Sequence, residues 1–193
     1  KVRRFLDAMA DAGPIIDTLR AEALANGAPS TWATLDVPSR VSDSVTLSTF
    51  HGCPAHEVEQ IAAQTLDWGW NTVIKLNPTL LGWQRARGLL DGLGYDFIDL
   101  DPEHFAKDLK WAQLLEMIPR LQDKAAAAGR HFGVKFTNTL ISNGGSDPAL
   151  QDLGDVDEVY VSGPPLHVLA MTLAAEFRAV FPDVPITFSA GID

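Results

Sequence analysis

Short apolar runs alternate along the chain with longer stretches in which apolar residues recur every three or four positions. The runs are rich in Val, Ile, Phe and Thr, which is typical of strands. Because apolar residues occupy both faces of each run, we interpret the runs as buried parallel strands. The expected strands are Ser44–Ser48, Thr72–Leu76, Asp96–Leu100, Phe132–Thr137, Glu158–Ser162 and Pro185–Ser189.

The stretches between the runs predict helices that are apolar on one face. One helix is expected over Ala55–Asp67, since Pro54 precedes it and Glu57 lies in its first turn. A helix is also expected over Lys1–Asn26, ahead of the first strand. Further helical spacing occurs around Trp83–Leu90, Leu114–Leu121 and Leu166–Val180.

Strands that alternate with helices indicate βα units on a parallel sheet, either an open doubly wound sheet or a (β/α)₈ TIM barrel. We favour the barrel, because polar residues follow several strand ends rather than a single crevice. A complete barrel needs eight strands, whereas about six βα units are present. We therefore expect residues 1–193 to form a single partial TIM-barrel domain of a larger multidomain protein.

Net charge and cysteine content argue against some classes of partner and favour one cellular location for this domain. The net charge is −10 and no basic stripe is present, which argues against nucleic acid and anionic membranes as partners. Cys53 is the one cysteine, so no internal disulfide forms, and a cytoplasmic location is favoured. No apolar run reaches the roughly 18 residues of a membrane span.

The first candidate chemistry lies between a strand and a helix, in Ser48-Thr49-Phe50-His51-Gly52-Cys53-Pro54. A thiol near an imidazole and a helix N-terminus would have a lowered pKa, which makes Cys53 and His51 candidate catalytic residues. The alternative is a tight βα turn in which Gly52 supplies backbone freedom. His51, Cys53 and His56 lack a fourth metal ligand, so we expect no metal site.

The second candidate is a pair of lysines inside apolar strands, Lys75 and Lys135. Such a lysine is costly unless its ammonium group meets an anion or an electron-rich group, so we expect ligand contact. Desolvation could instead make either lysine a Schiff-base nucleophile. A salt bridge to Asp99 or Asp101 is the structural alternative. Asn77 and Asn138 follow these strands and could present amides to a planar ring, although asparagines are also common in turns.

Small residues follow the last two expected strands, at Ser162-Gly163 and Ala190-Gly191. Many barrels bind phosphate at their last two strand-to-helix loops, which makes Ser162, Gly163 and Gly191 candidates. Pro164 and Pro165 weaken this prediction, because proline has no N–H to offer a phosphate. The acidic group Asp99, Asp101, Glu103 and His104 receives no role.

Several segments resemble known families. Val159–Pro164 and Phe181–Asp193 resemble the C-terminal part of dihydroorotate and dihydropyrimidine dehydrogenase barrels, and Phe132–Asn138 resembles their lysine strand. Val45–Pro54 and Ile74–Gly82 resemble the N-terminal barrel of the selenate reductase group, which is similar to the glutamate synthase small subunit. The resemblance implies FMN as cofactor, with Lys135 contacting the flavin. It also implies iron–sulfur and NADPH/FAD-binding domains outside this chain as partners.

The chain departs from these families at two points. Ala190 replaces a glycine of the phosphate turn, and the segment Asp99-Leu100-Asp101-Pro102 lacks the cysteine of the dehydrogenases. The leading hypothesis is a flavin-type oxidoreductase barrel that acts on a small planar or oxyanionic substrate. The alternatives are an aldolase-like Schiff-base lyase and a cofactor-free scaffold that docks electron-transfer domains.

Overall fold

A computed structural model describes residues 1–49, 51–144 and 157–189 of the chain. The chain divides into two compact units, Lys1–Val45 and Thr46–Asp193, which are described separately. No helix among the described residues is long and apolar enough to cross a membrane.

The first unit contains two α-helices and a short 3-10 helix instead of the single helix expected over Lys1–Asn26. Pro14 lies in the first turn of the second helix, where its missing N–H costs nothing, whereas inside one long helix it would break the hydrogen-bond ladder. Asp11 accepts a hydrogen bond from Gly13 N at the break. The elements are α1 (Val2–Ala10), α2 (Gly13–Ala25) and η1 (Ser30–Thr34).

The second unit is built on a four-stranded sheet with the order β1-β2-β3-β6. The strands are β1 (Ser44–Ser48), which begins in the first unit, β2 (Asn71–Leu76), β3 (Phe132–Phe136) and β6 (Ile186–Phe188). β2 pairs with β3, and β3 with β6, both in parallel register. The helices are α3 (Ala55–Asp67), η2 (Pro78–Leu81), α4 (Trp83–Gly92), α5 (Pro102–Lys107), α6 (Trp111–Ala127) and α7 (Pro164–Val180).

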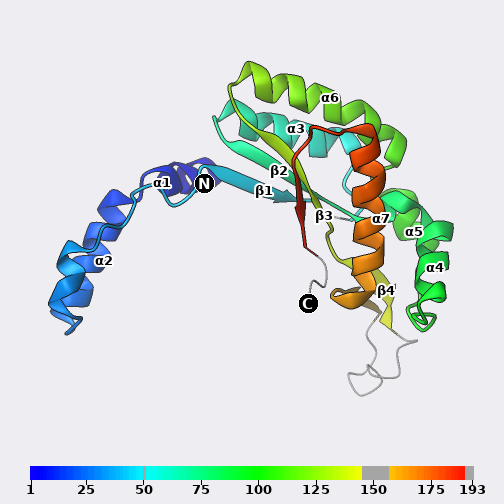
Figure 1. Ribbon diagram of the computed structural model, residues 1–193, viewed down its shortest axis with the longest axis horizontal. Coiled ribbons are helices and arrows are strands. Elements are labelled where there is room, and N and C mark those ends of the chain that lie inside the picture. The colour runs from blue at the N-terminus through cyan, green and yellow to red at the C-terminus, as the bar shows by residue number, and fades with distance from the viewer. Residues whose placement is uncertain (50, 145–156, 190–193) are drawn as a thin grey trace. The chain divides into compact units, whose positions relative to one another are not determined.

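One face of this sheet forms the core. Ile74, Leu76, Val134 and Phe136 are fully buried there, where α3 packs on β2, and α6 and α7 on β3 (Figure 1). On the other face, Lys75 and Lys135 stay half-buried. A parallel sheet with helices on its outer face and polar side chains on its inner face is part of a (β/α)₈ barrel, which confirms the expected fold class.

The segment Asp96–Leu100 does not form the expected strand. Side chains of α4 bind two of its carbonyl groups: Arg87 donates to Ile98 O, and Trp83 donates to Leu100 O. The carbonyl of Asp99 accepts hydrogen bonds from Asn143 N and Ser142 Oγ. β2 pairs directly with β3, so no further strand lies between them. The apolar residues Ile98 and Leu100 are buried, which explains the strand-like pattern.

The expected strand Glu158–Ser162 exists as β5 (Glu158–Val161), but it is antiparallel to β4 (Leu140–Asn143) in a separate two-stranded sheet. β4 is not among the expected strands. Both edges of β3 are paired, with β2 and β6, so β5 does not lie next to β3. The described sheet of the barrel therefore has four strands rather than six.

Candidate functional site

A row of polar side chains crosses the inner face of the sheet. Lys75 pairs with Lys135 in the β2–β3 register, and Lys135 pairs with Thr187 in the β3–β6 register. Directly paired residues of parallel strands share a face, and neighbouring strands lie about 4.8 Å apart. The two ammonium groups therefore belong to one site, which we call the lysine row (Lys75, Lys135 and Thr187).

The lysine row has no acidic partner among the described residues. Neither lysine takes part in an ion pair there. Asp101 instead accepts a hydrogen bond from Glu103 N, and Asp99 accepts one from Asn143 Nδ2. No ion pair between either lysine and these aspartates is found in the described part of the chain. Like charges side by side on a sheet are unfavourable, so an electron-rich or anionic ligand would stabilise the row.

The loops at the ends of β1, β2 and β3 are joined by a buried hydrogen-bonded cluster, here called the strand-end network (Thr49, His51, Asn77, Thr79 and Asp108). At its centre, His51 Nδ1 lies 2.7 Å from Asp108 Oδ2. His51 Nε2 lies 3.0 Å from the carbonyl oxygen of Thr139. Asp108 Oδ2 and the Thr139 carbonyl oxygen both accept hydrogen bonds, which favours a proton on each ring nitrogen and therefore the cationic form of His51. The amide nitrogen of Asn77 lies farther from Nδ1, at 3.5 Å.

The electrostatics agree with this protonation state. Burial disfavours the charged ring, but the hydrogen bond and charge of Asp108, with the Thr139 carbonyl, outweigh it and raise the pKa of His51. For Asp108, burial is outweighed by hydrogen bonds from His51, Thr79 and Gly52, which lower its pKa. The pair is therefore a buried salt bridge, in which His51 has no free nitrogen to act as a base.

Asp108 is the residue that sequence reasoning missed. It is 3% exposed and lies between α5 and α6. Besides His51, it accepts hydrogen bonds from Gly52 N, Asn77 Nδ2 (3.0 Å) and Thr79 Oγ1 (2.7 Å). No motif surrounds it in the sequence, and its partners are 29 to 57 positions away, so no local signal could have identified it.

The two candidate asparagines, Asn77 and Asn138, form hydrogen bonds that join the ends of neighbouring strands. Asn77 is buried, and its carbonyl oxygen lies 3.2 Å from Thr49 Oγ1. Asn138 donates from its side chain to Thr49 O and from its backbone to Leu76 O. Thr49 in turn donates to Lys75 O. The amides therefore hold β1, β2 and β3 together next to the lysine row, while their contact with a planar ring stays a prediction.

Cys53 does not have the lowered pKa that we expected. Partial burial, with the charges of Glu57 and Asp108, raises the pKa of its thiol. The nearby imidazolium is already neutralised by Asp108, which removes the cause of the expected shift. Its thiol lies 3.9 Å from Pro54 O. No metal-binding group of three His, Cys, Asp or Glu side chains is found among the described residues.

The predicted phosphate residues are described in part. Ser162 and Gly163 link β5 to α7, and Gly163 has a left-handed φ of 74°, which favours glycine. His167 in the first turn of α7 contacts Phe188 at the end of β6, with ring centroids 5.7 Å apart. The start of α7 therefore lies beside the end of the last strand. Gly191 lies outside the described residues.

A further polar group lies next to the lysine row. Thr137 follows β3 and is 2% exposed. Its hydroxyl oxygen is the buried side-chain atom that finds no hydrogen-bond partner in the described part of the chain. A buried unpaired hydroxyl is costly, so the Thr137 side chain is a candidate partner for a water molecule or a ligand.

Comparisons with known proteins agree with the barrel. Residues 1–193 match the family model described as "Oxidoreductase YgfK, N-terminal TIM-barrel domain". The chain is 44% identical over 159 residues to "Putative oxidoreductase YgfK" of Escherichia coli strain K12, and equally to that of strain O157:H7. These alignments cover 80% of this chain and 15% of each relative. No solved structure matches significantly.

Proposed function

Because the chain belongs to the family of N-terminal TIM-barrel domains of the oxidoreductase YgfK, we propose that it is a flavin-type oxidoreductase barrel. The lysine row on the inner face would bind the ring of FMN, and a small planar or oxyanionic substrate would lie against that ring. The observation that carries the proposal is the pairing of Lys75 with Lys135, neither of which forms an ion pair with a carboxylate within residues 1–49, 51–144 and 157–189.

The residues of the lysine row fit the ring end of a flavin. The isoalloxazine ring has an edge with two carbonyl oxygens, and ammonium groups are suitable donors to such an edge. The unpaired hydroxyl of Thr137 lies two positions after Lys135 and is a further potential donor. When bound, the flavin supplies hydride and electron transfer, which no amino-acid side chain provides.

The phosphate end of the site is supported more weakly. Ser162 and Gly163 offer a hydroxyl and a backbone N–H at the start of α7. Pro164 and Pro165 have no N–H, and Leu166 N already donates to Gly163 O. We therefore assign most of the binding contribution of this domain to the ring contacts.

The strand-end network has a positioning role in this proposal. Thr49 and Asn138 hydrogen-bond to the carbonyls of Lys75 and Leu76, and the His51–Asp108 pair holds the loops that carry them. Both lysines are thereby held on one face. The chain spans 15% of the length of its curated relatives. We propose that iron–sulfur and NADPH/FAD-binding domains of the full-length protein exchange electrons with this barrel.

The test is to purify the full-length protein, release any bound cofactor by denaturation and identify it by mass spectrometry. The proposal predicts FMN together with a flavin absorption band. Treatment with borohydride and small carbonyl compounds serves as the comparison, since a Schiff-base lyase would form a trapped adduct at Lys75 or Lys135. Full-length protein that never retains FMN, even after reconstitution, would contradict the proposal.

A further inference from the structure

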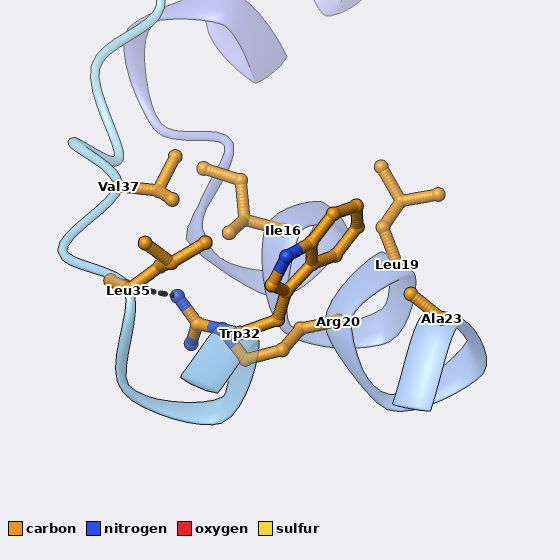
Figure 2. A pocket seen from close by; sticks show the side chains of 7 residues that line it. All are labelled: Ile16, Leu19, Arg20, Ala23, Trp32, Leu35 and Val37. Carbon is orange, nitrogen blue, oxygen red and sulfur yellow. Dashed lines mark hydrogen bonds between the residues drawn. The ribbon is translucent and has the colours of Figure 1, made fainter. Parts of the chain in front are cut away.

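The unit Lys1–Val45 carries an open apolar groove between α2 and the segment that follows η1 (Figure 2). Its lining includes Leu19, Trp32 and Leu35, and Arg20 donates a hydrogen bond to Leu35 O. Nothing in the described part of the chain shows what covers these side chains, so we assign no ligand or partner to the groove.

In the barrel unit, the hydroxyl of Thr137 differs from those of the other buried threonines. Each of the others forms at least one hydrogen bond through its hydroxyl group; they are Thr49, Thr65, Thr72 and Thr79. The hydroxyl oxygen of Thr137 forms none with the described residues, although it is buried. Because a buried polar group normally has a partner, this exception points to a partner outside the described residues.

The backbone around Thr137 is held on both sides, which restricts how far its side chain can move to find a partner. Thr137 N donates to Ser189 O at 3.3 Å, just after β6, and Asn138 N donates to Leu76 O at 2.8 Å, at the end of β2. The Asn138 side chain also donates to Thr49 O. These hydrogen bonds keep the Thr137 hydroxyl in one place, as binding groups require.

Thr137 lies close to the lysine row. It is two positions after Lys135, which corresponds to no more than about 7 Å along an extended strand. Its backbone neighbours are the ends of β2 and β6, the strands that carry Lys75 and Thr187. The three fused rings of a flavin are longer than this separation, so one bound ring can contact Lys135 and Thr137 together.

A hydroxyl group offers a contact that the ammonium groups of the lysine row cannot offer. An ammonium group is charged and only donates hydrogen bonds, whereas a hydroxyl is uncharged and can donate or accept. The isoalloxazine ring has ring nitrogen atoms as well as its two carbonyl oxygens, and these nitrogens donate or accept according to the oxidation state. The hydroxyl of Thr137 therefore suits an uncharged polar atom of the ring.

We propose that Thr137 is a flavin-binding residue, whose hydroxyl forms a hydrogen bond with an uncharged polar atom of the flavin ring. This inference rests on the function proposed above, and it adds a contact that depends on neither the lysine charges nor the phosphate. It has a consequence for stability, because a buried hydroxyl without a partner destabilises the fold. Removal of the hydroxyl should therefore weaken flavin binding without destabilising the barrel.

The test is Thr137→Val in the full-length protein, since valine has nearly the same shape as threonine but no hydroxyl. Fluorescence quenching of FMN gives the dissociation constant, and hydrogen exchange of the peptides that cover β3, in the apo form, reports local stability. Thr137→Val should bind FMN about fivefold more weakly, the factor expected for one uncharged hydrogen bond. Its β3 peptides should exchange no faster than those of the wild type.

The matched control is Thr65→Val at the other end of β2. The Thr65 hydroxyl is buried and has two partners, Ala62 O at 2.8 Å and Thr72 Oγ1 at 2.9 Å. This variant should show the opposite behaviour, with faster exchange and an unchanged dissociation constant for FMN. Thr137→Ser, which keeps the hydroxyl, should retain the wild-type affinity.

Faster exchange in Thr137→Val, whatever its affinity for FMN, would overturn the inference, because it would show that the hydroxyl has a structural partner. An unchanged dissociation constant in Thr137→Val would also overturn it, while leaving the proposed function intact. Wild-type protein that binds no FMN would contradict the proposed function itself, and the inference with it.

Discussion

At the scale of single residues, Asp108 contributes most to the geometry of the proposed site. Its carboxylate accepts hydrogen bonds from His51, Gly52, Asn77 and Thr79, which lie on two different loops. A buried charge pair adds little stability compared with apolar packing, but the loss of one partner is costly. The main effect of the His51–Asp108 pair is therefore to hold the strand ends in position. Its contribution to the stability of the fold is smaller.

The substitution Asp108→Ala should destabilise the protein by about 3–5 kcal/mol, because it removes the partner of His51 and leaves the donors Gly52 N, Asn77 and Thr79 without their acceptor. Denaturant unfolding followed by tryptophan fluorescence measures this change. The control is Asp123→Ala, at an exposed aspartate of α6, which should change the free energy of unfolding by less than about 0.5 kcal/mol. Equal effects of the two substitutions would argue against a buried ion pair.

The same pair predicts how stability depends on pH. The pKa of His51 is raised in the folded state, so its contribution is complete below the unfolded value of about 6.5 and is lost as pH rises through the folded value. The pKa of Asp108 is lowered, so its contribution is complete above about 3.9 and is lost as pH falls through the folded value. Stability from the pair is therefore greatest between about pH 4 and 6.5.

Unfolding free energies measured from pH 5 to 9 test this prediction. The wild-type protein should lose stability on the alkaline side, and Asp108→Asn should flatten this loss because it removes the charge that holds the proton on His51. An unchanged alkaline slope in Asp108→Asn would show that another group causes the loss.

Cys53 should react slowly with alkylating reagents, since its raised pKa leaves less thiolate at neutral pH than an ordinary cysteine has. The measurement is the rate of iodoacetamide labelling of the native protein at pH 7, compared with the same protein unfolded in denaturant. We expect the native rate to be lower. A faster native rate would restore the interpretation of Cys53 as an activated thiol.

At the scale of elements, the sequence correctly predicted the helices and strands whose local apolar pattern agrees with their surroundings in the folded chain. β1 and α3 have the expected bounds, because their apolar spacing and the Pro54 start are local signals. Asp96–Leu100 was predicted wrongly as a strand of the sheet, since β2 pairs directly with β3 and side chains of α4 bind the carbonyls of Ile98 and Leu100. The lysine row was predicted as two strand lysines, but their direct pairing depends on which strands are neighbours, which no local pattern specifies.

Gly133 of β3 lies close to the backbone of Pro185, the residue before β6. A Cβ atom there would lie 2.9 Å from Pro185 O, closer than real Cβ contacts. Gly133→Ala should therefore separate the two strands and destabilise the fold by about 1–3 kcal/mol. Gly88→Ala, in the interior of α4 with nothing within 4 Å, should instead stabilise it by up to about 1 kcal/mol. Thermal unfolding of both variants gives the comparison, and a neutral Gly133→Ala would contradict the β3–β6 pairing.

At the scale of the whole molecule, the chain belongs to a family of N-terminal barrel domains. Its curated relatives are much longer than the chain itself. Its described sheet has a covered outer face and an inner face that carries the lysine row. Its N-terminal unit carries a separate apolar groove. For the inner face we propose cofactor binding.

The central claim is that the lysine row binds the flavin ring, and the affinity for FMN tests it most directly. Fluorescence quenching of FMN by the apo form of the full-length protein gives the dissociation constant. Lys135→Met should weaken binding by roughly 10- to 100-fold, since a hydrogen bond from a charged donor contributes about 1.5–3 kcal/mol. Lys107→Met, at an exposed lysine of α5, should leave the dissociation constant unchanged. Equal affinity of the two variants for FMN would contradict the account.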